Sequence, residues 1–160
     1  MIIDPQNVRA RIGSNYPQQF QPLVAGRIKK RLGNFAGLKN FGVNWVTLKP
    51  GSCSALRHWH SKQDEFIYIV SGEATLITND GEQKLTSGMA AGFPAGEANG
   101  HHLVNRSDGD VIYLEIGVGK ARQRHRTPQD YVTYPDNDLV AVDDNGSWKF
   151  THKDDSPYDE

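Results

Sequence analysis

From Arg27 onward the chain divides into short apolar stretches, with a turn signal about every eight to twelve residues. This spacing is typical of an all-β sandwich or barrel, because it leaves no room for a long helix. Short connections such as Asn79-Asp80-Gly81 favour antiparallel pairing of the strands that they join. The predicted strands cover residues 43–48, 56–60, 65–70, 74–78, 83–85, 101–104 and 111–116.

The first 26 residues differ from this pattern. Residues 1–26 are polar and are interrupted by Pro5, Pro17 and Pro22, so they are predicted to form an arm over the domain rather than a helix. An arm that is swapped with, or bridges to, a second copy of the chain is an alternative.

The remaining residues fit one domain, because 160 residues are too few for two cores of ordinary size. Residues 27–119 are expected to form a barrel. Residues 120–160 are expected to form a C-terminal extension that packs on the same domain. Its last part is predicted to be a small hairpin, with strands at 139–142 and 147–150 around the turn Asp144-Asn145-Gly146.

The composition narrows the partners of this chain. Eighteen Lys and Arg nearly balance nineteen Asp and Glu, so no strong field would attract nucleic acid and small molecules are the expected partners. Cys53 is the single cysteine, which excludes an intramolecular disulfide framework and a zinc cluster built on thiolates. No leader pattern is visible, and no apolar run approaches the ~20 residues that span a bilayer. These features predict a cytoplasmic protein without a membrane partner.

The densest group of metal-ligand residue types is His58-Trp59-His60 with Glu65 after four intervening residues. Side chains two apart on a strand face the same side, so both imidazoles can reach one ion while Trp59 faces the other way. A short loop would then return the chain, and Glu65 would open the next strand and add a carboxylate oxygen. Trp59 is expected to pack between sheets or at a subunit contact. Arg57 is expected to support the same surface, with phosphate binding as the alternative.

A second segment supplies a fourth candidate ligand. His101 and Asn105 are four residues apart and share a face if the segment is extended, whereas His102 would point the opposite way with Val104. His101 is therefore the preferred ligand. A bulge near Gly100 would exchange the roles of His101 and His102.

At these residues the sequence resembles the cupin superfamily. The first cupin motif places two histidines, a glutamate and two glycines at fixed spacings, and Gly51, His58, His60, Glu65 and Gly72 match it. One departure is that six residues, where five are usual, separate Gly51 from His58.

The second cupin motif is matched by Gly88, Pro94, Gly96, His101 and Asn105. Here the departure is larger, because four residues rather than two stand between Gly96 and His101. This difference enlarges a loop at the mouth of the expected barrel.

The wider pattern resembles a bacterial group of single-domain cupins that is often labelled sugar-phosphate isomerase by analogy. The resemblance implies a double-stranded β-helix, which is a jelly-roll-like barrel, and a divalent metal held by His58, His60, Glu65 and His101. It also implies a homodimer. The segments that carry it are residues 57–60, 64–66, 92–96 and 113–117.

Three imidazoles and one carboxylate suit manganese, iron, nickel, cobalt or zinc better than calcium or magnesium. The first functional hypothesis is an isomerase or lyase of sugar-phosphate type, in which the metal polarises a small oxygen-rich substrate and Glu97 in the enlarged loop acts as the base. An iron-dependent dioxygenase is the alternative among enzymes. A metal-dependent module that binds or senses a small molecule without catalysis is the alternative outside them.

Overall fold

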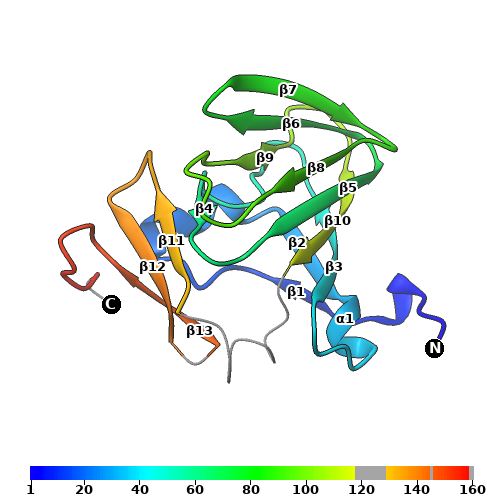
Figure 1. The fold of residues 1–160 in the computed structure, drawn as a ribbon. Helices are drawn as coiled ribbons and strands as arrows, with labels where there is room; N and C mark the ends of the chain where they lie inside the picture. Colours follow the sequence, from blue (N-terminus) through cyan, green and yellow to red (C-terminus); the bar gives the residue numbers. More distant parts are fainter. Residues whose placement is uncertain (118–128, 145, 159–160) are drawn as a thin grey trace.

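The computed structural model describes residues 1–117, 129–144 and 146–158, and its regular secondary structure is mainly β-strand. Its antiparallel strands form three sheets (Figure 1). A six-stranded sheet has the order β1-β2-β3-β10-β5-β8, a three-stranded sheet the order β7-β6-β9, and a four-stranded sheet the order β13-β12-β11-β4. The all-β prediction is confirmed. The strands are β1 (Ala10–Ile12), β2 (Arg27–Arg31), β3 (Gly42–Leu48), β4 (Trp59–His60), β5 (Glu65–Ser71), β6 (Glu73–Thr78), β7 (Gly81–Thr86), β8 (Ala90–Phe93), β9 (His102–Val104), β10 (Val111–Gly117), β11 (Tyr131–Tyr134), β12 (Leu139–Asp144) and β13 (Ser147–Thr151).

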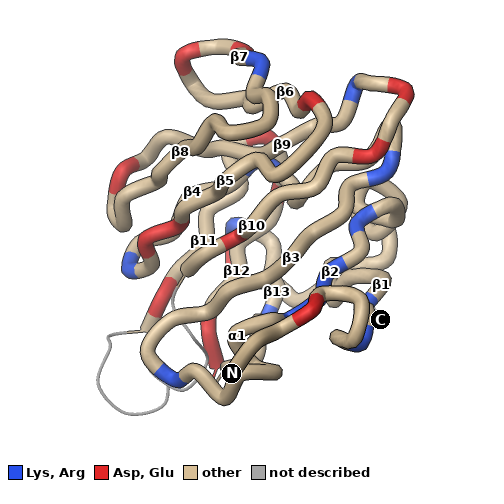
Figure 2. The backbone as a smooth tube through the Cα atoms, turned by 90° about the vertical axis from the view of Figure 1, so that its right-hand side faces the viewer, with Lys and Arg blue, Asp and Glu red and all other residues tan. Residues whose placement is uncertain are grey.

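The six-stranded and three-stranded sheets enclose an aliphatic core, called the barrel core below. Alternation along β5 puts every second side chain inside, as with Ile67 and Ile69. Figure 2 shows the strands of the larger sheet running side by side, with few charged residues along β3, β5 and β10. The buried members of the barrel core are Val46, Leu48, Ile67, Ile69, Ala74, Leu76, Leu85, Leu103, Val111 and Tyr113.

A second apolar cluster joins the two ends of the chain, and it is called the terminal cluster below. It lies against the four-stranded sheet and draws side chains from the first 26 residues, from the segment before β4 and from β11 and β12. Phe20, Trp148, Phe150 and Tyr158 pack against it. Its buried members are Tyr16, Val24, Leu56, Val132, Tyr134, Leu139 and Ala141.

The helices are short. They are η1 (Pro5–Asn7) and η2 (Gln18–Val24), both 3₁₀-helices, and α1 (Leu32–Phe35). The prediction that residues 1–26 contain no helix is wrong over η1 and η2. Helix η2 accommodates Pro22 and buries Val24 in the terminal cluster. None of the helices in the described part of the chain has the length and apolar character that a membrane crossing requires.

Most predicted strands appear with small shifts at their ends, but the strand expected at 56–60 is shorter. Only Trp59–His60 is regular strand, and His58 precedes it in an isolated bridge. The C-terminal hairpin is present as β12 and β13, although Asn145 of its turn lies outside the described residues. Strands β1, β2, β8 and β11 were not predicted. The domain boundaries at residues 26 and 119 stay predictions.

Gly72 shows why the spacing between β5 and β6 is strict. Its φ is +84°, and a Cβ atom there would lie 2.5 Å from the carbonyl oxygen of Asp110. Only glycine combines this backbone conformation with so close an approach. The turn that follows β5 depends on this residue.

Candidate metal centre

His58 and His101 are cross-strand neighbours. The backbone N–H of His58 donates to the carbonyl oxygen of His101 over 3.2 Å, and the N–H of His101 donates back over 2.8 Å. The two ring centroids are consequently 4.9 Å apart. His60 lies two residues further along and shares the face of His58, at a ring distance of 5.2 Å. The bridge brings the three rings together despite the enlarged loop.

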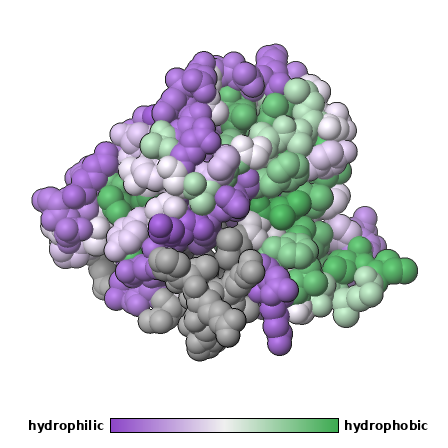
Figure 3. All heavy atoms as spheres, viewed as in Figure 1, coloured by the Kyte–Doolittle hydropathy of each residue, from purple (hydrophilic) through white to green (hydrophobic). Residues whose placement is uncertain are grey.

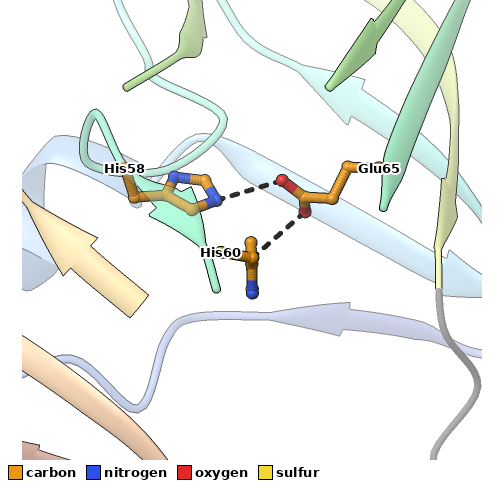
Figure 4. Close-up of side chains that lie close together, drawn as sticks. All are labelled: His58, His60 and Glu65. Atoms are coloured by element: carbon orange, nitrogen blue, oxygen red, sulfur yellow. Dashed lines mark ion pairs between the residues drawn. The ribbon is translucent and has the colours of Figure 1, made fainter. Parts of the chain in front are cut away.

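Glu65 opens β5 and places its carboxylate among these rings. One oxygen lies 3.4 Å from Nε2 of His58 and the other 3.5 Å from Nε2 of His60 (Figure 4). The candidate ligand atoms of these three residues all lie within 4.8 Å of one another, which is close enough to share an ion. The two histidines and the glutamate of the first motif therefore lie together, as predicted from their spacing.

His101 and His102 point to opposite sides. Nε2 of His101 is 2.8 Å from a carboxylate oxygen of Glu65, and its ring stacks on Phe93 with centroids 3.6 Å apart. Nδ1 of His102 instead lies 2.9 Å from the carbonyl oxygen of Ala55. Of the two alternatives the geometry favours His101. Its role as a fourth ligand stays a prediction, because the compact group contains only His58, His60 and Glu65.

Each inward ring has a protein oxygen next to its Nδ1. For His58 this is the carbonyl oxygen of Leu56 at 2.8 Å, for His60 a carboxylate oxygen of Asp130 at 2.6 Å, and for His101 the carbonyl oxygen of Asn99 at 3.4 Å. A ring that donates from Nδ1 presents the lone pair of Nε2 on its other side. All three Nε2 atoms therefore face Glu65, on the side of each ring where a metal would bind.

Asp130 is a functional candidate that the sequence did not reveal. Its side chain is only 3% exposed, and besides His60 it accepts hydrogen bonds from the Ser61 hydroxyl and the Lys62 backbone N–H. It lies 70 residues from His60 in the chain and reaches it because β11, which starts one residue later, pairs with β4. The pairing of β11 with β4 is the signal that could have found it, and β11 was not predicted.

The neighbouring charges shift the pKa values of Glu65 and His60. Burial alone would raise the pKa of Glu65, but the surrounding His58, His101 and His60 hold it well below its ordinary value. Burial would likewise lower the pKa of His60, but hydrogen bonds to Asp130 and Glu65 raise it to about 9. In His101 burial dominates and lowers the pKa. Without a metal, the group is thus held together by an ionised carboxylate and a protonated His60.

The donor set fits a divalent transition metal. Imidazole nitrogens with one carboxylate suit manganese, iron, cobalt, nickel and zinc. A carboxylate or carbonyl partner behind each ring is the arrangement that orients metal-binding histidines in proteins. The residues therefore match the cofactor class predicted from the sequence.

A cavity of about 210 Å³ opens beside this group. Glu65 and His101 form part of its wall, and the predicted base Glu97 lines it from the enlarged loop. Trp59, expected to pack away from the ligands, also lines the cavity. A smaller cavity of about 40 Å³ lies on the inner side and shares Glu65 and His101 with the first.

Arg57 has a structural role, because its guanidinium group is fully engaged in contacts within the protein. Two of its nitrogens each lie 2.7 Å from an oxygen of Asp136, and the third donates to Asn79 and to the carbonyl oxygen of Gly100. Arg57 therefore ties the turn after β11 to the loops around the cavity. This contact pattern favours the supporting role over phosphate binding.

An antiparallel barrel that gathers three histidines and one glutamate beside a cavity is typical of small β-barrel proteins with a candidate metal site. Residues 44–117 match the cupin domain family. A cupin-superfamily sugar phosphate isomerase from Silicibacter pomeroyi is 40% identical, with 99% of this chain and 97% of that chain covered and a TM-score of 0.90. The chain belongs to the cupin superfamily, and its barrel is the double-stranded β-helix of that family.

Two further similarities are more distant. A protein from Acidithiobacillus ferrooxidans, provisionally named a sugar phosphate isomerase, is 28% identical over 88% of this chain and 84% of its own, with a TM-score of 0.72. An oxalate decarboxylase from Arthroderma benhamiae is 36% identical over 89 residues, which are 52% of this chain. This chain spans only 20% of that decarboxylase, so the likeness covers a small part of a much longer protein.

Proposed function

We propose that the chain is a metal-dependent isomerase or lyase for a small oxygen-rich substrate. The observation that carries the proposal is the convergence of three Nε2 atoms on the Glu65 carboxylate, beside a cavity that can admit a ligand. His58, His60, Glu65 and His101 would hold the ion. The names of the full-length structural relatives suggest a substrate related to sugar phosphates.

In this proposal the bound metal supplies Lewis acidity to substrate oxygens. The chain itself orients the ligand rings through Leu56, Asp130 and Asn99. Glu97 lines the same cavity as Glu65 and His101, so its carboxylate is the candidate to accept and return a proton at a carbon next to a carbonyl.

The test begins with metal analysis of protein purified without added ions. We expect close to one equivalent of a divalent transition metal per chain, and its loss in the combined variant His58→Ala and His60→Ala. The metal-loaded protein is then incubated with sugar phosphates, keto acids and catechols. Binding of a compound without any conversion would refute the enzymatic proposal, and conversion of catechols with uptake of oxygen would indicate a dioxygenase instead.

We also propose that the chain forms a homodimer through the outer face of the six-stranded sheet. Phe66 and Tyr68 of β5 are exposed there, and Leu114 and Ile116 of β10 lie opposite them in the sheet register. Figure 3 shows hydrophobic side chains gathered on the right-hand side of the molecule, where β5 and β3 lie. An apolar face of this kind suits a self-complementary contact between two copies.

Light scattering after gel filtration tests the dimer. We expect the wild-type chain to elute as a dimer and the variant Tyr68→Lys as a monomer. Tyr131→Lys, which changes an equally exposed aromatic residue of the four-stranded sheet, is the matched control and should stay dimeric. A monomeric wild-type protein at high concentration would contradict the proposal. A cytoplasmic location remains a separate prediction.

A further inference from the structure

His101 has weaker polar support than the other two inward histidines. Its Nδ1 lies 3.4 Å from the carbonyl oxygen of Asn99, whereas Nδ1 of His58 and Nδ1 of His60 have oxygen partners at 2.8 Å and 2.6 Å. Hydrogen bonds weaken as they lengthen, and N–H···O bonds in proteins usually span roughly 2.7–3.2 Å. Asn99 also belongs to the enlarged loop and not to a strand. The hydrogen bond behind His101 therefore does little to fix the direction of its ring.

A contact between two ring faces supports His101 in its place. The Phe93 ring lies parallel to the His101 ring to within 3°, and their centroids are 3.6 Å apart. At this separation the atoms of the two faces are in van der Waals contact. The two histidine rings of the first motif have looser aromatic neighbours, which are tilted or edge-on with centroids at 5.9 Å and 5.8 Å. Face-to-face stacking thus distinguishes His101 from the other two rings.

The six-stranded sheet places Phe93 next to the metal centre. Phe93 is the last residue of β8, and it is the register partner of Glu65, the first residue of β5. Register partners in an antiparallel pair project from the same face, so the phenyl ring and the carboxylate lie side by side. Nε2 of His101 meets that carboxylate at 2.8 Å. Phe93 therefore links the position of the His101 ring to the position of Glu65.

His101 borders open space on both sides of this contact. Phe93 and His101 line the cavity of about 210 Å³ and also the smaller inner cavity of about 40 Å³, so the stacked pair stands between the two. A side chain that borders open volume can adopt other rotamers, because no neighbouring atoms exclude them. Removal of the phenyl ring would consequently leave the His101 ring free to turn away from Glu65.

From these observations we infer that Phe93 is the positioning residue of the fourth ligand. Its ring holds Nε2 of His101 toward Glu65, and so it decides whether the metal has three protein ligands or four. The inference rests on the proposed function, in which His101 binds the ion. A phenyl ring offers no donor atom to a metal, so Phe93 acts through His101 alone, as part of the apolar shell that tunes a metal site.

A double-mutant cycle on zinc affinity, measured by chelator competition on the full chain, tests the inference. Phe93→Leu keeps an apolar side chain but removes the flat ring, and we expect the affinity to fall about five- to tenfold, as the loss of an aromatic pair would cause. His101→Ala should lower the affinity by about tenfold or more. In the His101→Ala background, Phe93→Leu should change the affinity by less than about twofold. Equal losses from Phe93→Leu in both backgrounds would overturn the inference, because the ring would then support the fold and not His101.

Two further variants test the shape and the place of the ring. Phe93→Tyr retains the stacking face and should keep the affinity within about twofold of the wild type. Phe66→Leu makes the same chemical change on the opposite, exposed face of β5, one residue from Glu65, and should also stay within about twofold. A loss in either variant as large as that in Phe93→Leu would contradict a role for the Phe93 ring face.

Cobalt(II)-loaded protein gives a readout of the His101 ring itself. A histidine that binds cobalt through Nε2 and keeps a proton on Nδ1 gives a paramagnetically shifted, exchangeable proton signal. We expect such signals from His58, His60 and His101, and the His101 signal is identified by its loss in His101→Ala. In Phe93→Leu that signal alone should weaken or broaden. The same change in all three signals, or in none, would overturn the inference.

The outcomes separate this inference from the proposed function. Wild-type protein that binds neither zinc nor cobalt would refute the proposed function and the inference with it. An affinity that is unchanged in His101→Ala would refute His101 as a ligand, and hence also the role of Phe93. Metal binding that depends on His101 but not on Phe93 would refute the inference alone and leave the metal centre standing.

Discussion

The barrel core and the terminal cluster are two apolar regions of similar burial with different composition and different reach along the chain. The barrel core is almost wholly aliphatic and lies within residues 46–113, whereas the terminal cluster includes Tyr16 and Tyr134 and joins residues from 16 to 141. The barrel core holds the six-stranded and three-stranded sheets together. The terminal cluster backs β4 and β11, so it fixes where His58, His60 and Asp130 lie.

Truncation of one fully buried leucine in each region should produce the largest effect. Leu48→Ala in the barrel core and Leu139→Ala in the terminal cluster should each reduce the free energy of unfolding by about 2–5 kcal/mol, as measured by urea denaturation. Only Leu139→Ala should also weaken metal binding per folded molecule. If both variants, or neither, changed the metal affinity, the division of roles would be wrong.

Asp130→Asn should separate the orientation of His60 from the stability of the fold. The substitution keeps the shape of the side chain but removes the charge that holds His60, so we expect metal affinity to fall about 10–100-fold in a chelator competition assay. Asp143→Asn is the matched control, since Asp143 is a buried carboxylate of the same sheet that contacts Gly146 instead. A similar loss in both variants would contradict a specific role for Asp130.

The pH dependence of stability should differ between metal-free and metal-loaded protein. The pKa of His60 is raised to about 9 in the folded chain, so its stabilising contribution is complete below its unfolded pKa of ~6.5 and is lost as the pH rises to 9. We expect a loss of about 2–3 kcal/mol over this range without metal.

Metal binding requires the neutral ring, so affinity should increase over the same pH range. Urea denaturation at several pH values, with and without metal, measures both trends. A metal-free stability that does not change between pH 6.5 and 9 would show that Asp130 and Glu65 do not hold the proton on His60.

The smallest expected effect comes from removing a buried tyrosine hydroxyl group in each of the two regions. Burial raises the pKa of the Tyr16 hydroxyl beside Tyr134 in the terminal cluster, and that of the Tyr113 hydroxyl beside Ser54 in the barrel. Tyr16→Phe and Tyr113→Phe should each lower stability by about 0.5–1.5 kcal/mol and leave metal affinity within about twofold. A larger loss of metal affinity in Tyr16→Phe would extend the role of the terminal cluster to its hydroxyl groups.

Much of the barrel could be predicted because its signals are local. Alternation puts Ile67 and Ile69 on one face, glycines mark the turns, and the His-x-His spacing fixes a shared direction for two rings. Two of the missed strands lack such signals: β2 reads Arg-Ile-Lys-Lys-Arg, and β8 contains Ala90, Ala91 and Gly92, which have low strand propensity.

The second half of the site depended on contacts that no local pattern encodes. His101 could be chosen over His102 by strand alternation, but the bridge that brings it to His58 spans 43 residues of chain, from 58 to 101. Asp130 has no motif around it and is identified only by the pairing of β11 with β4. The alternation rule also left Trp59 outside the site, because it does not describe the cavity that opens past the end of the short β4.

The 70-residue separation of Asp130 from His60 has a kinetic consequence. Contacts between distant parts of a chain form late, because closing a long loop costs more entropy than closing a short one. We therefore expect the barrel to fold before the C-terminal strands dock. Only afterwards would Asp130 orient His60 for metal binding. The metal would then enter a chain that is already folded, instead of guiding its folding.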